Sequence, residues 1–111
     1  MGNEDYKGRA LALKQEIEYA PGAIVSKTLL RKEAGNLTLF AFDEGQELSE
    51  HTSPFDAVAQ VVEGEGTFII AGEPVQVGEG EMIIMPAGVP HNVRAVGGRF
   101  KMLLIMIRSE K

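Results

Sequence analysis

Two stretches decide the fold of this chain: Gly80-Glu-Met-Ile-Ile-Met-Pro-Ala-Gly-Val-Pro-His91 and Gly45-Gln-Glu-Leu-Ser-Glu-His-Thr-Ser-Pro54. Each stretch contains one of the two histidines of the sequence, His51 and His91, and frames it with glycine and proline. Glycine adopts the positive φ angles of tight turns and proline fixes its own φ angle, so both residues mark bends between short strands. We therefore predict a small β-barrel in which the two histidines, although distant in sequence, face one shared cavity.

The pattern beyond these stretches is that of an all-β domain. From Ile24 onward, short apolar runs alternate with turn residues at close spacing, which favours a sandwich or barrel over strands that alternate with helices. We predict tight reversals at Gly64-Glu-Gly66 and Gly72-Glu-Pro74, and a two-residue hairpin turn at Gly97-Gly98. The expected strands are Ile24–Arg31, Leu37–Asp43, Glu47–His51, Asp56–Glu63, Thr67–Ala71, Val75–Val77, Met82–Met85, His91–Val96 and Arg99–Arg108.

The length and composition indicate one domain. With 111 residues, of which 44% are hydrophobic, the chain can bury a core without a disulfide or a structural metal. We assign residues 24–111 to the barrel and residues 1–23 to an N-terminal extension, in which Leu11, Leu13, Ile17 and Tyr19 allow either a short strand or a helical turn. Most large apolar side chains of the strands are predicted to be core: Phe40, Phe42, Phe55, Phe68, Met82, Met85, Met102 and Met106.

Charge and cysteine content exclude several classes of function. Sixteen acidic and eleven basic residues give a net charge of −5, and no cluster of Lys or Arg is dense enough to bind a nucleic acid backbone. The absence of cysteine excludes thiolate metal sites and a cysteine nucleophile, and it is compatible with the cytoplasm. No apolar run approaches the length of about 20 residues that spans a bilayer, and the N-terminus lacks the pattern of a secretory signal. We expect a soluble cytoplasmic protein that binds neither nucleic acid nor membranes.

The last expected strand indicates a partner surface. Phe100-Lys-Met-Leu-Leu-Ile-Met-Ile107 is apolar on both alternating faces, whereas a strand with one wet face alternates with polar residues. Its second face is covered either by the N-terminal segment or by a second copy of the chain, which would pack here and on residues 24–30. We expect a homodimer.

Together, the glycines, prolines and histidines resemble the two sequence motifs of small single-domain cupins. The resemblance covers residues 37–96 and implies a double-stranded β-helix, also called a jelly roll. Members of that family hold a divalent metal in the barrel on three histidines and a glutamate. The positions that match the first motif are Gly45, His51 and Gly64, and those that match the second are Gly80, Pro86, Gly88 and His91.

The departures from the family pattern concern the metal. Ser53 stands where the resemblance implies a second histidine, and Ala57 stands where it implies the glutamate, or Val58 if the spacing is one residue longer. Ala95 replaces the final asparagine of the second motif. Residues i and i+2 of a strand share a face, so Ser53 is expected beside His51 in the pocket, where a hydroxyl is a poor ligand. A metal held by His51 and His91 is therefore expected to be weakly bound or absent.

Two nearby residues are candidates to replace the lost ligands. Asp56 lies one residue from the family's acidic position, and Pro54 could shift the register enough to turn it inward, although simple alternation points it outward. Gln60 is a weaker candidate for the same pocket. If a metal binds, the resemblance implies Fe, Mn, Ni or Zn, with His51 and His91 as ligands and Asp56 or water completing the shell.

Three functions remain open at this stage. The preferred one is a binding protein for a small molecule, with a pocket anchored by the two histidines. A second is a metal-dependent enzyme similar to cupin dioxygenases, isomerases or decarboxylases. The third is a sensor or interaction module that uses the apolar C-terminal strand as its contact surface. The sequence does not identify a substrate, because one fold hosts unrelated chemistries.

Overall fold

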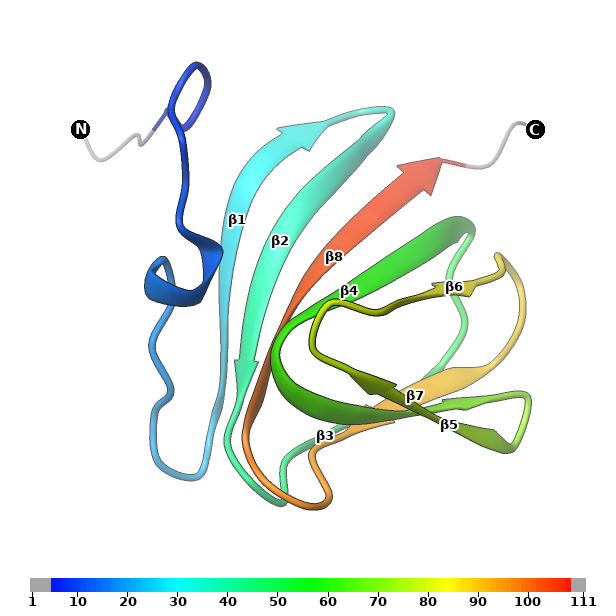
Figure 1. The fold of residues 1–111 in the computed structure, drawn as a ribbon. Helices are drawn as coiled ribbons and strands as arrows, with labels where there is room; N and C mark the ends of the chain where they lie inside the picture. Colours follow the sequence, from blue (N-terminus) through cyan, green and yellow to red (C-terminus); the bar gives the residue numbers. More distant parts are fainter. Residues whose placement is uncertain (1–4, 109–111) are drawn as a thin grey trace.

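The protein is built almost entirely of β-strands, as the sequence predicts. The computed structural model describes residues 5–108 (Figure 1). Among these residues, no helix is long and apolar enough to cross a membrane. A single 3-10 turn, Leu13–Gln15, precedes the strands. The strands are β1 (Ile24–Lys32), β2 (Gly35–Phe42), β3 (Glu47–His51), β4 (Phe55–Ile70), β5 (Glu73–Gly78), β6 (Met82–Met85), β7 (His91–Arg94) and β8 (Phe100–Arg108).

Strand β4 belongs to two antiparallel sheets and joins them into a curled barrel. Up to Gly64 it pairs with β8 and β6, and beyond Gly64 it pairs with β5 and β7. The ladder with β8 shifts register between Val61 and Glu63, and Gly64 adopts a φ of +79°. A bulge next to a glycine at positive φ bends a strand, so β4 curls from one sheet into the other (Figure 1). The predicted reversal at residues 64–66 is wrong, because the chain bends there without turning back.

The other two turn predictions have opposite outcomes. The reversal at residues 72–74 is confirmed: Ala71 and Gly72, with φ of +51° and +86°, form a two-residue loop between β4 and β5. The hairpin at Gly97-Gly98 is wrong, because β7 pairs with β3 and β4 whereas β8 pairs with β2 and β4. This loop carries the chain from one sheet to the other.

Stacked phenylalanines fill one part of the barrel. The rings of Phe42 and Phe100 stack with centroids 4.6 Å apart, and Phe68 meets Phe100 edge-on at 6.1 Å. All three side chains are fully buried. The backbone of β4 passes so close to them that a Cβ at Gly66 would lie 2.7 Å from the Phe100 ring. The bend of β4 and the aromatic cluster therefore require one another.

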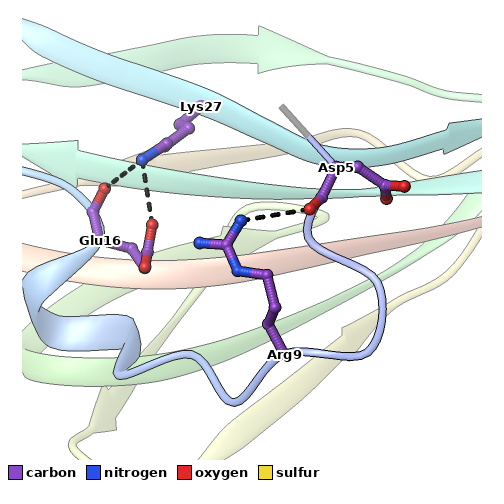
Figure 2. Close-up of polar contacts among 4 residues, drawn as sticks. All are labelled: Asp5, Arg9, Glu16 and Lys27. Atoms are coloured by element: carbon purple, nitrogen blue, oxygen red, sulfur yellow. Dashed lines mark hydrogen bonds and ion pairs between the residues drawn. The ribbon is translucent and has the colours of Figure 1, made fainter. Parts of the chain in front are cut away.

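The N-terminal segment covers part of the outer face of the β1–β2–β8 sheet. Ile17 is buried there with Leu39 and Ala41, and Leu103 of β8 packs against this cluster. The ammonium of Lys27 donates to the backbone oxygen and to the carboxylate of Glu16 at 2.9 and 3.1 Å, which ties the segment to β1 (Figure 2). Of the two alternatives for the second face of β8, the N-terminal segment thus covers the half around Leu103.

The other half of this outer face has no cover from within the described chain. Ile105 of β8 pairs with Leu37 of β2 and with Val58 of β4, and Val58 in turn pairs with Ile84 of β6. Ile84 and Ile107 are 58% and 52% exposed, which is unusual for large apolar side chains in one patch. We call this surface the outer apolar face; its residues are Leu30, Leu37, Val58, Met82, Ile84, Ile105 and Ile107.

Replacement of Phe100 by alanine is expected to destabilise the barrel by about 3–5 kcal/mol, because it leaves a cavity between Phe42 and Phe68 that the rigid sheets cannot close. Urea denaturation followed by circular dichroism measures the change. Val96→Ala, at a position that is 54% exposed, is the control and should change stability little. A loss at Phe100 no larger than that of the control would contradict the role given to the aromatic cluster.

Candidate functional site

The structure brings the two predicted histidines into contact. His51 ends β3 and His91 begins β7, and the two residues are paired across the antiparallel ladder of these strands. Their ring centroids lie 4.5 Å apart with an interplanar angle of 67°, an edge-to-face arrangement. Neighbouring side chains of an antiparallel pair lie on the same face of the sheet. The pairing of β3 with β7 is therefore what makes one site of two distant histidines.

Both imidazoles are held in the same way by the backbone. The Nδ1 atom of His51 lies 2.7 Å from the carbonyl oxygen of Ser49, and the Nδ1 atom of His91 lies 3.1 Å from that of Val89. A carbonyl oxygen only accepts, so each Nδ1 must carry the proton and donate it. In a neutral ring the lone pair is then on Nε2. This is the arrangement that prepares a histidine to bind a metal ion or to accept a hydrogen bond through Nε2.

The environments of the two rings differ. His91 is only 5% exposed, whereas His51 is exposed at the rim. Burial lowers the pKa of His91 below its ordinary value of 6.5, and the nearby His51 lowers it further, while the bond to Val89 acts in the opposite direction. His91 is therefore a neutral imidazole at pH 7 and offers an unprotonated Nε2.

The two histidines line a small apolar pocket inside the barrel. Its free volume is about 40 Å³, enough for a few water-sized groups or one ion and far below the several hundred Å³ of a typical organic ligand site. Apart from the imidazoles, the lining is aliphatic or thioether. It consists of Leu48, His51, Ala57, Met85, His91, Val93, Met102, Leu104 and Met106.

A larger groove lies elsewhere, between the β4–β5 hairpin and the loop that follows β7. It has a volume of about 550 Å³, and Arg99 and Glu65 are among its lining residues. It contains neither histidine, and the side chains of Thr67 and Gln76 in it bond to each other at 2.6 Å. We place the site at the smaller pocket because there the Nε2 atoms of two oriented imidazoles meet an apolar surface.

The structure does not bring the other three predicted site residues into the pocket. The Ser53 hydroxyl accepts a bond from the backbone N–H of Phe55 at 3.0 Å. Asp56 points the opposite way from Ala57, which lines the pocket, and its carboxylate accepts from the N–H of Ala87 at 2.8 Å. Gln60 is exposed and pairs with Met82 on the outer side of the sheet.

Asp56 and Ser53 instead position the loop that leads to His91. Besides the bond from Ala87 to Asp56, the N–H of Gly88 donates to the carbonyl of Ser53 at 2.8 Å. The N–H of Ala71 donates to the carbonyl of Pro90, also at 2.8 Å. Hydrogen bonds thus fix the segment between β6 and β7 at both ends. They also fix the backbone position of His91, the first residue of β7.

The methionines that line the pocket, Met85, Met102 and Met106, belong to the group of large apolar residues that the sequence predicted to be mostly core. Met85 of β6 and Met106 of β8 both pair with Ala57 of β4, from opposite sides, and both side chains line the pocket. Their long side chains occupy the space beside the alanine. Strand parity places Met106 on the inner face with Met102, but only the tertiary structure shows that both side chains line the same pocket as the histidines.

The residues present do not fit the hard divalent metal site implied for cupins. Within residues 5–108, no group of three or more His, Cys, Asp or Glu side chains is arranged to hold a metal ion. The alanine at position 57 offers no ligand atom, and the carboxylate of Asp56 is engaged by Ala87 on the outer side. Two imidazoles alone leave such an ion with an incomplete protein shell.

Comparison with known proteins agrees with this architecture and assigns the family. The family model of the cupin domain matches residues 38–108, and the chain therefore belongs to the cupins. The predicted jelly roll of a small single-domain cupin is confirmed. A curated relative, the uncharacterized protein SCO3923 of Streptomyces coelicolor, is 29% identical over 81 residues, which are 73% of this chain and 77% of that protein.

Two solved structures are particularly similar. The conserved protein SPY1581 of unknown function from Streptococcus pyogenes has a TM-score of 0.87 and 36% identity, with 94% of this chain and 90% of that chain covered. A cupin 2 conserved barrel domain protein from Leptotrichia buccalis also has a TM-score of 0.87, with 40% identity. The match covers 88% of this chain and 47% of that one, so this chain corresponds to about half of it.

Nuclear magnetic resonance of ¹⁵N-labelled histidine should show both rings, when neutral, with the proton on Nδ1, and a pKa of His91 below 6.5. The unfolded chain takes up a proton near pH 6.5 while folded His91 resists it, so the free energy of unfolding should fall as the pH is lowered through 6.5. Long-range ¹H–¹⁵N spectra recorded across this pH range show which ring nitrogen carries the proton and measure the pKa. Urea denaturation at each pH measures the free energy of unfolding. A neutral ring protonated on Nε2, or a pKa of His91 above 6.5, would contradict the geometry described here.

Proposed function

We propose that this cupin is a binding protein whose ligand is held by the Nε2 atoms of His51 and His91 and enters the apolar pocket beneath them. The observation that carries the proposal is the contact of the two rings at 4.5 Å with each Nδ1 engaged by a backbone carbonyl. Side chains held this way lose little freedom on binding, which favours affinity.

The size and lining of the pocket limit what the ligand can be. A volume of about 40 Å³ admits an ion or a group of a few atoms, and a larger molecule must leave the rest of itself outside, at the rim beside His51. Apart from the two imidazoles, no residue of the lining carries a group that titrates near neutral pH. These features support binding rather than the turnover of a cupin dioxygenase, isomerase or decarboxylase.

In protein purified without chelator, native mass spectrometry and elemental analysis should detect a bound species that His51→Ala and His91→Ala each reduce at least about tenfold. Gln60→Ala is the matched control, because Gln60 belongs to β4, like Ala57 of the pocket, but is exposed on the outer side of the sheet. The same preparations are titrated with Zn²⁺ as a probe of the two Nε2 atoms. Occupancy that is equal in all variants, or the lack of any bound species together with histidine signals that Zn²⁺ leaves unchanged, would contradict the proposal.

We further propose that the chain forms a homodimer through the outer apolar face. The N-terminal segment covers the neighbouring half of this sheet, and Met82, Ile84 and Ile107 remain 56%, 58% and 52% exposed. A second copy can cover the same patch on both partners at once, since a two-fold axis makes the surface complementary to itself. The face spans five strands, so it can supply the area that a stable dimer needs.

Light scattering coupled to gel filtration should give the mass of a dimer for the wild type and of a monomer for Ile107→Glu, because the substitution buries a charge in the proposed interface. Val96→Glu, at an exposed apolar position in the loop after β7, should remain dimeric. A wild-type monomer at micromolar concentration would overturn the dimer.

A further inference from the structure

Two imidazoles and three thioethers line one pocket of this barrel. His51 and His91 lie at the rim and the wall, and Met85, Met102 and Met106 complete the surface around the free volume. Met85 and Met102 are 2% and 0% exposed. No carboxylate belongs to this lining, so the potential ligand atoms of its side chains are nitrogen and sulfur alone.

Strand register distinguishes the three methionines. Met85 and Met106 both pair with Ala57, two residues from the start of β4, whereas Met102 pairs with Val61. Val61 lies four residues further along β4, which corresponds to about 13 Å at 3.3 Å per residue. Met85 and Met106 are therefore at one level of the barrel, on either side of the alanine, and Met102 belongs to the floor of the pocket.

Thioether sulfur and neutral imidazole together select a soft metal ion. Mg²⁺, Mn²⁺ and Ca²⁺ prefer carboxylate and water, which the lining does not offer, whereas Met and His ligands suit Cu(I). A monovalent ion with neutral ligands also brings less charge into an apolar pocket than a divalent ion does. The volume of about 40 Å³ is sufficient for a single ion.

We propose that the pocket is a Cu(I) site in which the Nε2 atoms of His51 and His91 and the sulfur of Met85 or Met106, or of both, are the ligands. The inference rests on the proposed function, because it names the ligand of the same histidine pair. The methionines take the place of the carboxylate of other cupins: alanine at position 57 removes that group, and thioethers from the two adjacent strands fill its space. The ligand set of the site thus contains thioether sulfur where other cupins have a carboxylate oxygen.

Buried methionine is also a common filler of irregular cores, so the test must separate sulfur from volume. Methionine-to-leucine replacement does this, since it keeps the size of the side chain and removes the ligand atom. Met82 supplies the matched control: it belongs to β6 like Met85, but it lies on the outer apolar face and is 56% exposed.

The experiment is an anaerobic titration of the full chain with Cu(I) against the chromophoric chelator bicinchoninate. The wild type should bind one Cu(I) per chain, and the double variant Met85→Leu/Met106→Leu should bind it at least about tenfold more weakly. Met82→Leu should match the wild type. X-ray absorption at the copper edge should show sulfur scattering in the wild type that the double variant loses, and circular dichroism verifies that each variant is folded.

The outcomes separate this inference from the proposed function. Cu(I) affinity that is lost in His51→Ala and His91→Ala but unchanged in the double leucine variant would overturn the sulfur ligation and leave the histidine pair as the binding site. Cu(I) affinity that is unchanged in the histidine variants as well would overturn the whole Cu(I) site, whereas the proposed function is overturned by its own test with the bound species and Zn²⁺. Loss of affinity in both sets, with sulfur scattering confined to proteins that retain Met85 and Met106, is the result expected.

Discussion

The architecture depends on the curvature of a single strand. β4 pairs with β8 and β6 over its first part and with β5 and β7 over its last, so it is the only strand shared by the two sheets of the described barrel. The bend is possible because Gly64 adopts a left-handed conformation and because Gly66 leaves space for the Phe100 ring. Once β4 is bent, β7 lies along its second half, and the pairing of β7 with β3 brings the two histidines together.

The site at the end of this barrel is defined by what surrounds the histidines as much as by the histidines themselves. Each imidazole is oriented by a bond from Nδ1 to a carbonyl two residues earlier in the chain. Around them, Ala57 and three methionines provide an environment without carboxylates. A pocket of this kind disfavours hard cations, which lose their water without receiving oxygen ligands in exchange. The family fold is retained, while the side chains that line its pocket offer nitrogen and sulfur as ligand atoms.

Much of the fold could be predicted from local chemistry. Alternating apolar residues and turn residues predicted Glu47–His51 and Met82–Met85 with the bounds that the structure has, because each strand lies between a glycine shortly before it and a proline shortly after it. The failures occurred where a glycine has two possible roles. Gly64 and Gly66 permit a reversal as well as a bend, and the partners on both sides of β4, which no local pattern reveals, select the bend. Gly97 and Gly98 likewise connect two sheets because β7 and β8 lie on different sides of β4.

By itself, the sequence determined that the chain is an all-β domain, because turn residues and strand alternation act over a few residues. The resemblance of its glycine, proline and histidine motifs to those of cupins added the family and made His51 and His91 the polar candidates of the interior. Tertiary structure alone decided the surroundings of that pair. It turned Asp56 and Gln60 outward and placed Met85 and Met106 on either side of Ala57. It also covered half of the face of β8 with residues 13–19. The physical reason is that register between strands distant in sequence is set by the packing of the whole barrel, and a shift of one residue exchanges the inner and outer side chains.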